Sequence, residues 1–155
     1  MKAFSVKGVP IGNAHLTIIA GPCLAESAAV CEEVAGAMKE LCAEFGFGYI
    51  FKASFDKANR TSAGTVRGAG MEAGLQIIAD TAAKFGLPAT TDIHLPEQAA
   101  EVASVIDLLQ IPAFLCRQSD LLEAAAVTGK PVNVEKGQFL APHDTKNIVE
   151  KLAGY

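Results

Sequence analysis

The sequence predicts an α/β protein in which helices cover a parallel sheet. Three observations support this prediction. Short apolar runs of strand type alternate with longer segments of helical periodicity along the 155 residues. The apolar runs are nearly continuous, as expected for parallel strands that are buried on both faces. Polar side chains follow almost every run, so functional groups would gather at one edge of the sheet.

The composition is that of a globular chain of ordinary one-domain size. Hydrophobic residues make up 50% and charged residues 19%, so we expect 1–155 to fold as a single domain. The net charge of −4 argues against nucleic acid and anionic membranes as partners. There is no signal-type segment, and no run reaches the roughly 18 apolar residues that span a bilayer. We therefore expect a cytoplasmic protein.

The first half of the chain begins with a lead-in segment over 1–16. Residues 3–16 alternate loosely around glycine, proline and Asn13, which indicates a hairpin or an extended strand. A compact apolar strand follows over 16–20 and stops at Gly21-Pro22. The spacing of apolar residues then predicts a helix over 27–46, a strand over 49–53 and a helix over 71–86.

The same alternation continues to the end of the sequence. Proline at position 96 suits the first turn of a helix, where its missing N–H is tolerated. The predicted elements are a strand over 88–94, a helix over 96–103, a strand over 105–111, a helix over 120–127, a strand over 131–134 and a helix over 142–152.

Two architectures fit this alternation, a doubly wound sheet and a barrel. A doubly wound sheet usually has a glycine-rich first turn, but Gly21-Pro22-Cys23 does not match G-x-G-x-x-G. A barrel gathers the loops that follow all its strands, and polar residues follow nearly every strand here. They are Cys23, Lys52, Asp92, His94, Gln110 and Lys136. This distribution favours a barrel.

A cationic loop follows the apolar strand that ends near Phe51. Lys52, Lys57, Arg60 and Arg67 are predicted to converge near the carboxyl end of this strand. In an acidic protein, such a concentration of cations indicates an anionic ligand, and the planar guanidinium of arginine suits phosphate or carboxylate. The alternative is a solvated basic loop without a ligand.

Five stretches of the chain carry family motifs, namely residues 20–23, 51–62, 91–94, 109–118 and 133–142. Together they resemble the 3-deoxy-manno-octulosonate 8-phosphate synthases. The resemblance implies a (β/α)8 TIM barrel, of which this chain would cover about the first five β/α units. It also implies a homo-oligomeric transferase, a tetramer, that condenses phosphoenolpyruvate with arabinose 5-phosphate during lipopolysaccharide synthesis.

The resemblance implies roles for the cations of the loop. Lys52, Lys57 and Lys136 would hold phosphoenolpyruvate, with Gln110 beside it. Arg67 would add a further positive charge. Fixed cations are needed because two phosphorylated substrates and a carboxylate repel each other before the enol carbon can attack the aldehyde.

The same loop would select the sugar phosphate. By resemblance, Asn59, Arg60 and Ser62 would hold it, and Arg117 would reach its phosphate from a neighbouring subunit. The heptulosonate 7-phosphate synthases, which use erythrose 4-phosphate, typically have Lys-Pro-Arg-Thr where this chain has Lys57-Ala58-Asn59-Arg60-Thr61. They remain the alternative function.

Asp92, His94 and Lys57 are the candidate catalytic residues. Asp92 could orient a lysine or the sugar hydroxyls, or act as a plain counter-ion for a lysine, and His94 could orient substrate. His15 and His143 are expected to be solvated or structural.

Cys23 is a candidate metal ligand. Metal-dependent members of the family have cysteine at this position and metal-independent members have asparagine, so the resemblance implies a divalent metal, Zn, Fe or Mn. A thiolate suits Zn²⁺ or Fe²⁺. The alternative is packing as a small apolar side chain, which is expected for Cys31, Cys42 and Cys116. None of the four cysteines has tight metal-binding spacing, so reduced thiols are expected.

The sequence departs from the family pattern in three respects. Glu135 stands where a lysine often precedes Lys136, and His143 stands where tryptophan is usual. A full barrel needs roughly 250 residues, and the family's other metal ligands and a further phosphate-binding arginine lie beyond Tyr155. We expect the chain to be part of a longer enzyme. The alternatives are a shortened, non-catalytic phosphate-binding half-barrel and a structural chain that survives only by pairing with another chain.

Overall fold

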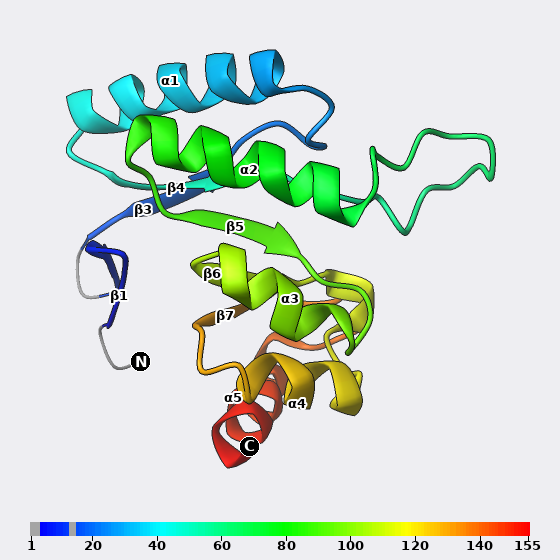
Figure 1. Cartoon of the computed structure of the whole chain (residues 1–155). Helices are drawn as coiled ribbons and strands as arrows, with labels where there is room; N and C mark the ends of the chain where they lie inside the picture. Colours follow the sequence, from blue (N-terminus) through cyan, green and yellow to red (C-terminus); the bar gives the residue numbers. More distant parts are fainter. Residues whose placement is uncertain (1–3, 13–14) are drawn as a thin grey trace. The chain divides into compact units, whose positions relative to one another are not determined.

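The computed structural model describes residues 4–12 and 15–155. Its backbone packs as two compact units, of which one ends at Thr91 and the other is Asp92–Tyr155. The expectation of a single domain over 1–155 stays a prediction. Figure 1 shows strands and helices alternating along the chain.

The first unit opens with a hairpin. Strand β1 (Phe4–Val6) pairs antiparallel with β2 (Val9–Ile11), with Phe4 opposite Ile11. Lys7 has a positive φ of 47° in the two-residue turn, as tight hairpin turns require. The hairpin lies within the lead-in segment predicted over 1–16, while Asn13 lies outside the described residues.

Strands β3 (Thr17–Ala20), β4 (Gly48–Lys52) and β5 (Ala89–Asp92) follow. β3 pairs parallel with β4 from Thr17 opposite Gly48 to Ala20 opposite Phe51, and β4 pairs parallel with β5, where Lys52 lies opposite Thr90. Ile50 and Phe51 are fully buried. The apolar run at 49–51 thus forms a buried parallel strand, as predicted.

Two helices lie side by side against these strands (Figure 1). Helix α1 (Ala28–Glu44) begins after Ser27, whose side chain accepts a hydrogen bond from the N–H of Val30. Helix α2 (Met71–Phe85) ends at Gly86, which adopts the left-handed conformation with φ 63°. Lys84 of α2 forms a 2.6 Å ion pair with Glu32 of α1. Both helices were predicted with nearly these bounds.

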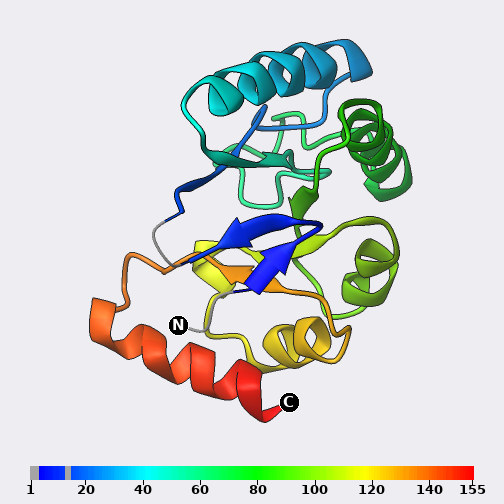
Figure 2. The same ribbon diagram turned by 90° about the vertical axis from the view of Figure 1, so that its left-hand side faces the viewer.

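The second unit repeats the alternation with shorter elements. β6 pairs parallel with β7, with Leu109 opposite Val132 and Ile111 opposite Val134. Helices α3 and α4 contact β6, and α5 runs beside α4 (Figure 2). The elements are α3 (Gln98–Val105), β6 (Leu108–Ile111), the 3-10 turn η1 (Ala113–Leu115), α4 (Ser119–Ala126), β7 (Val132–Val134), the 3-10 turn η2 (Pro142–Asp144) and α5 (Thr145–Gly154).

Three predicted element starts in this unit were wrong by two or more residues. The helix predicted from Pro142 begins at Thr145, after the 3-10 turn η2. The helix predicted from Pro96 begins at Gln98, because the carbonyl of Pro96 accepts the N–H of Ala99 in a turn that precedes the helix. The strand predicted from Val105 begins at Leu108. The N–H of Ile106 still donates to the carbonyl of Val102, so helical bonding continues through β-branched residues that favour a strand.

In the described residues, strands β3 to β7 are each followed by a helix, and the strands pair in parallel within each unit. This confirms the predicted alternation of β/α units. Within the described residues, no helix is both long enough and apolar enough to cross a membrane.

Candidate active site

Lys52 and Lys57 come together where β4 ends, and we call them the lysine pair. Both ammonium groups donate to the hydroxyl of the fully buried Ser54, at 3.1 Å from Lys52 and 2.9 Å from Lys57. The two positive charges therefore lie within about 6 Å of each other. An anion placed between them would relieve their repulsion, so this geometry favours phosphate or carboxylate binding.

The turn after β3 supports the lysine pair from the backbone side. A Cβ on Gly21 would lie 1.9 Å from the carbonyl oxygen of Lys52, so only glycine allows this close approach. The N–H of Ala25 donates to the carbonyl of Ser54 at 2.9 Å. The turn thereby fixes the backbone from which Lys52 and Ser54 project. Cys23 is exposed in the same turn.

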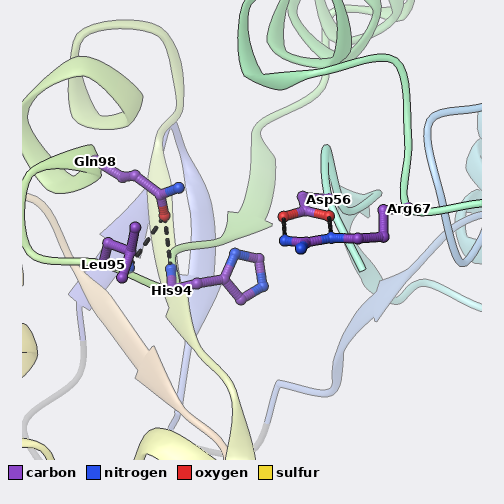
Figure 3. A network of polar contacts seen from close by, with 5 residues as sticks. All are labelled: Asp56, Arg67, His94, Leu95 and Gln98. Atoms are coloured by element: carbon purple, nitrogen blue, oxygen red, sulfur yellow. Dashed lines mark hydrogen bonds and ion pairs between the residues drawn. The ribbon is translucent and has the colours of Figure 1, made fainter. Parts of the chain in front are cut away.

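The loop between β4 and α2 projects away from the strands of its unit and is closed at its base (Figure 1). The N–H of Lys57 donates to the carbonyl of Arg67 at 2.8 Å. The guanidinium of Arg67 donates two hydrogen bonds to the carboxylate of Asp56, and its Nε lies 2.9 Å from Oδ1 (Figure 3). Hydrogen bonding and the charge of Asp56 raise the pKa of Arg67.

Beyond this closed base, the predicted sugar-phosphate residues are exposed. Asn59, Arg60 and Ser62 lie in the outer part of the loop. The predicted convergence of four cations is thus only partly seen in this unit. Lys52 and Lys57 meet, whereas Arg67 is paired with Asp56 and Arg60 lies in the outer part.

In the second unit, polar side chains meet around the amide of Gln110. Its Nε2 donates to Asp92 Oδ1 at 2.5 Å and to Glu135 Oε1 at 3.1 Å, and its Oε1 accepts from Asn133 Nδ2 at 2.8 Å. Asp92 and Gln110 are buried. We call these four residues the Gln110 network. It joins the last residue of β5 to β6, β7 and the residue after β7.

Two further predicted residues of this unit, His94 and Lys136, are close in sequence to members of the Gln110 network. His94 is half-buried, and its backbone N–H donates to Gln98 Oε1 at 2.8 Å, as does that of Leu95 at 3.1 Å (Figure 3). The ammonium of Lys136 donates to the carbonyls of Gly137 and Leu140, both at 2.9 Å.

Arg117 lies between η1 and α4 and is exposed. It lines a cavity of about 260 Å³ together with side chains that include Asp144, Asn147 and Lys151. Lys151 also donates to the hydroxyl of Ser119 at 2.9 Å. The cavity therefore contains charges of both signs.

Three residues of these sites were not predicted as functional. Ser54 is the acceptor between the two lysines, and Asn133 and Glu135 complete the Gln110 network. The alternation of side chains along a strand placed Ser54 on the same side as Lys52, which was a usable signal. No comparable local signal connects Asn133 or Glu135 with Gln110, because they follow Gln110 by 23 and 25 residues.

The described residues do not by themselves form a metal site. A catalytic metal usually has about three protein ligands. Within residues 4–12 and 15–155, no group of three or more histidine, cysteine, aspartate or glutamate side chains is placed to hold an ion. Cys23 could supply one thiolate.

A series of parallel β/α units with polar side chains after the strands is typical of the β/α-barrel class. The chain belongs to the DAHP synthetase I family, whose sequence pattern matches residues 2–154. This is a TIM-barrel family, which confirms the predicted fold class.

Curated relatives confirm the resemblance drawn from the motifs. The chain is 58% identical over 134 residues to the 2-dehydro-3-deoxyphosphooctonate aldolase of Dechloromonas aromatica, covering 86% of this chain and 48% of the relative. The corresponding protein of Nitrobacter winogradskyi is 58% identical over 151 residues, covering 97% and 53%. That of Fusobacterium nucleatum is 57% identical over 141 residues, covering 91% and 51%. The chain spans about half the length of these relatives.

Proposed function

We propose that the chain forms part of an enzyme that condenses phosphoenolpyruvate with arabinose 5-phosphate. The products would be 3-deoxy-manno-octulosonate 8-phosphate and phosphate, in lipopolysaccharide precursor synthesis. The lysine pair is the observation that carries the proposal, because two ammonium groups share one neutral acceptor at the exit of a buried strand. The names of relatives at 57–58% identity support the choice of reaction.

In this proposal, the lysine pair neutralises phosphoenolpyruvate. The substrate carries a phosphate and a carboxylate, and the acceptor brings a second phosphate. Preorganised cations offset this repulsion and allow the enol carbon to approach the aldehyde carbon, where the new carbon–carbon bond forms. Lys136 would contribute a further ammonium group, and Asp92 and His94 would orient reacting groups.

The outer part of the loop would bind the acceptor. Asn59, Arg60 and Ser62 are exposed and polar, and they can donate hydrogen bonds to a sugar phosphate. Arg117 would reach the phosphate from a neighbouring subunit of a homo-tetramer, which its exposure permits. Faster condensation with erythrose 4-phosphate than with arabinose 5-phosphate would instead assign the heptulosonate 7-phosphate reaction.

Cys23 is proposed as one ligand of a divalent metal, Zn, Fe or Mn. Its thiol is exposed in the turn after β3, and its partner ligands would come from residues outside these 155. All four cysteines are described, and none forms a disulfide, which supports a reducing, cytoplasmic location.

Substitution of the lysines tests the proposal directly. Lys57→Ala and Lys136→Ala should each raise the dissociation constant of phosphoenolpyruvate at least about tenfold, or about 1.4 kcal/mol, in a calorimetric titration. Lys146→Ala is the matched control, because it removes one exposed lysine from the surface of α5. Unchanged affinity in both variants would remove these lysines from the site.

A further inference from the structure

Glu135 connects two strand exits of the second unit. Its Oε1 accepts from Gln110 Nε2 at 3.1 Å, and its Oε2 accepts from the backbone N–H of Ala113 at 3.2 Å. Gln110 belongs to β6 and Ala113 opens the turn that follows it. Glu135 itself comes directly after β7 and directly before Lys136. One carboxylate therefore holds the exit of β7 against the exit of β6.

The same contact determines how the amide of Gln110 is oriented. Its nitrogen has two hydrogens, and they serve Asp92 Oδ1 and Glu135 Oε1. Its oxygen accepts from Asn133. The opposite orientation would place the amide oxygen against two carboxylates and the amide hydrogens against an NH₂ group, so charge selects the observed one. Because Gln110 is only 3% exposed, water cannot readily replace a lost partner.

We propose that Glu135 is a positioning residue, which orients the Gln110 amide toward Asp92 and anchors the backbone that presents Lys136. The effect on ligand affinity rests on the proposed function, because Lys136 is assigned to phosphoenolpyruvate there. The orientation of Gln110 does not rest on it.

A rival explanation treats Glu135 only as a negative charge beside a cation. These two explanations predict opposite signs. If only charge matters, removing the carboxylate should strengthen the binding of an anion, and equally so in Glu135→Gln and Glu135→Ala. If Glu135 positions its neighbours, both variants should weaken binding. Ala should do so more than Gln, because a glutamine amide oxygen can still accept from one of the two donors.

The experiment uses the full chain and two measurements. Calorimetric titration with phosphoenolpyruvate should give a dissociation constant about fivefold higher for Glu135→Ala and about twofold higher for Glu135→Gln. Side-chain amide signals of Gln110 in ¹H–¹⁵N spectra should shift in both variants and exchange faster with solvent in the alanine variant. Glu150→Gln is the control, because it removes one carboxylate from an exposed i,i+4 pair with Lys146. It should change neither measurement.

Each outcome decides for or against the proposal. Equal strengthening of binding by the two substitutions overturns it, and so do unchanged Gln110 signals in Glu135→Ala. If the unsubstituted chain fails to bind phosphoenolpyruvate, the proposed function fails, while the amide signals still decide the role of Glu135. If the alanine variant does not fold, Glu135→Gln gives the same two measurements.

Discussion

The lysine pair and the Gln110 network are electrostatic opposites. In the first unit, two cations point at one neutral hydroxyl, that of Ser54. In the second unit, two carboxylates accept from one neutral amide, that of Gln110. Each arrangement places two like charges around a single uncharged group.

The two arrangements differ in how completely the central group is satisfied. The Gln110 amide uses both hydrogens and its oxygen within the network, so it gains most from keeping its present partners. The lysine pair places two ammonium groups within about 6 Å of each other, so an anion bound between them would interact favourably with both. The difference agrees with the proposed function, in which the lysine pair binds phosphoenolpyruvate.

The largest effect is expected from enlarging Gly21. Gly21→Val would force the turn after β3 away from the Lys52 carbonyl, because the added Cβ would lie 1.9 Å from that backbone oxygen. Such overpacking should cost about 3 kcal/mol in urea-induced unfolding, together with loss of phosphoenolpyruvate binding. Gly64→Ala is the control, since an added Cβ there meets no atom within 4 Å. Equal stability of Gly21→Val and the wild type would contradict the close approach.

The second prediction concerns alkaline pH and the first unit. Burial raises the pKa of the Cys31 thiol above its usual value of 9.0 and raises the pKa of Tyr49, whose hydroxyl donates to the Ala20 carbonyl. A raised folded-state pKa means that the folded protein holds the proton more tightly than the unfolded chain does. The contribution of these two groups to the free energy of unfolding should therefore be constant below their pKa values in the unfolded chain. It should fall as the pH rises above about 9.

Hydrogen exchange measured between pH 8 and pH 11 tests this sign, after correction for the intrinsic pH dependence of exchange. Amides of β3, β4 and α1 should lose protection as the pH rises. Protection that increases in these elements over the same range would show that the two groups are not buried as described.

The third prediction concerns the Ser54 hydroxyl, which accepts from both members of the lysine pair. Ser54→Ala deletes the shared acceptor, so Lys52 and Lys57 lose a common anchor and spread apart. The dissociation constant of phosphoenolpyruvate should rise about fivefold, which corresponds to about 1 kcal/mol. Ser104→Ala removes a hydroxyl that donates to the Glu101 carbonyl on exposed helix surface, and it should leave affinity unchanged. The same loss in both variants would deny Ser54 a specific role.

The smallest effect is expected from the base of the projecting loop. Arg67→Ala removes an ion pair in which the arginine side chain is 60% exposed, so the loss of stability should be small. Chemical denaturation measures this change, with Lys146→Ala as the surface control. A loss as large as that expected for Gly21→Val would mean that Arg67 contributes to the core of the unit rather than to the loop.

The sequence predicted elements well where local pattern decides the outcome. Helix α2 was expected over 71–86 because apolar side chains recur at helical spacing and glycine follows. Strand β4 was expected because Tyr49, Ile50 and Phe51 are β-branched or aromatic, as in a buried strand. The boundary at Val105 failed because a β-branched residue favours a strand locally, while helical bonding continues through Ile106 in the folded chain.

The candidate site was predicted less completely because its contacts are between distant residues. The motifs placed Lys52 and Lys57 after one strand, and the structure brings them to one hydroxyl. The pairing of Arg67 with Asp56 depends on how an eleven-residue separation closes into a loop. The contact of Glu135 with Gln110 depends on strand register across 25 residues. Neither closure nor register is encoded in local spacing.

The closed base of the projecting loop has a consequence for how acceptor choice can change during evolution. The Lys57–Arg67 backbone bond and the Asp56–Arg67 fork hold the two ends of residues 58–66 together. Substitutions within residues 58–66 should alter the exposed part of the loop without disturbing Ser54 or the strands. The contacts at the base already hold the two ends of the loop together and offset the entropy cost of closing it. Under the proposed function, residues 58–66 therefore form an exchangeable module, in which new sugar preferences can arise while the phosphoenolpyruvate side stays intact.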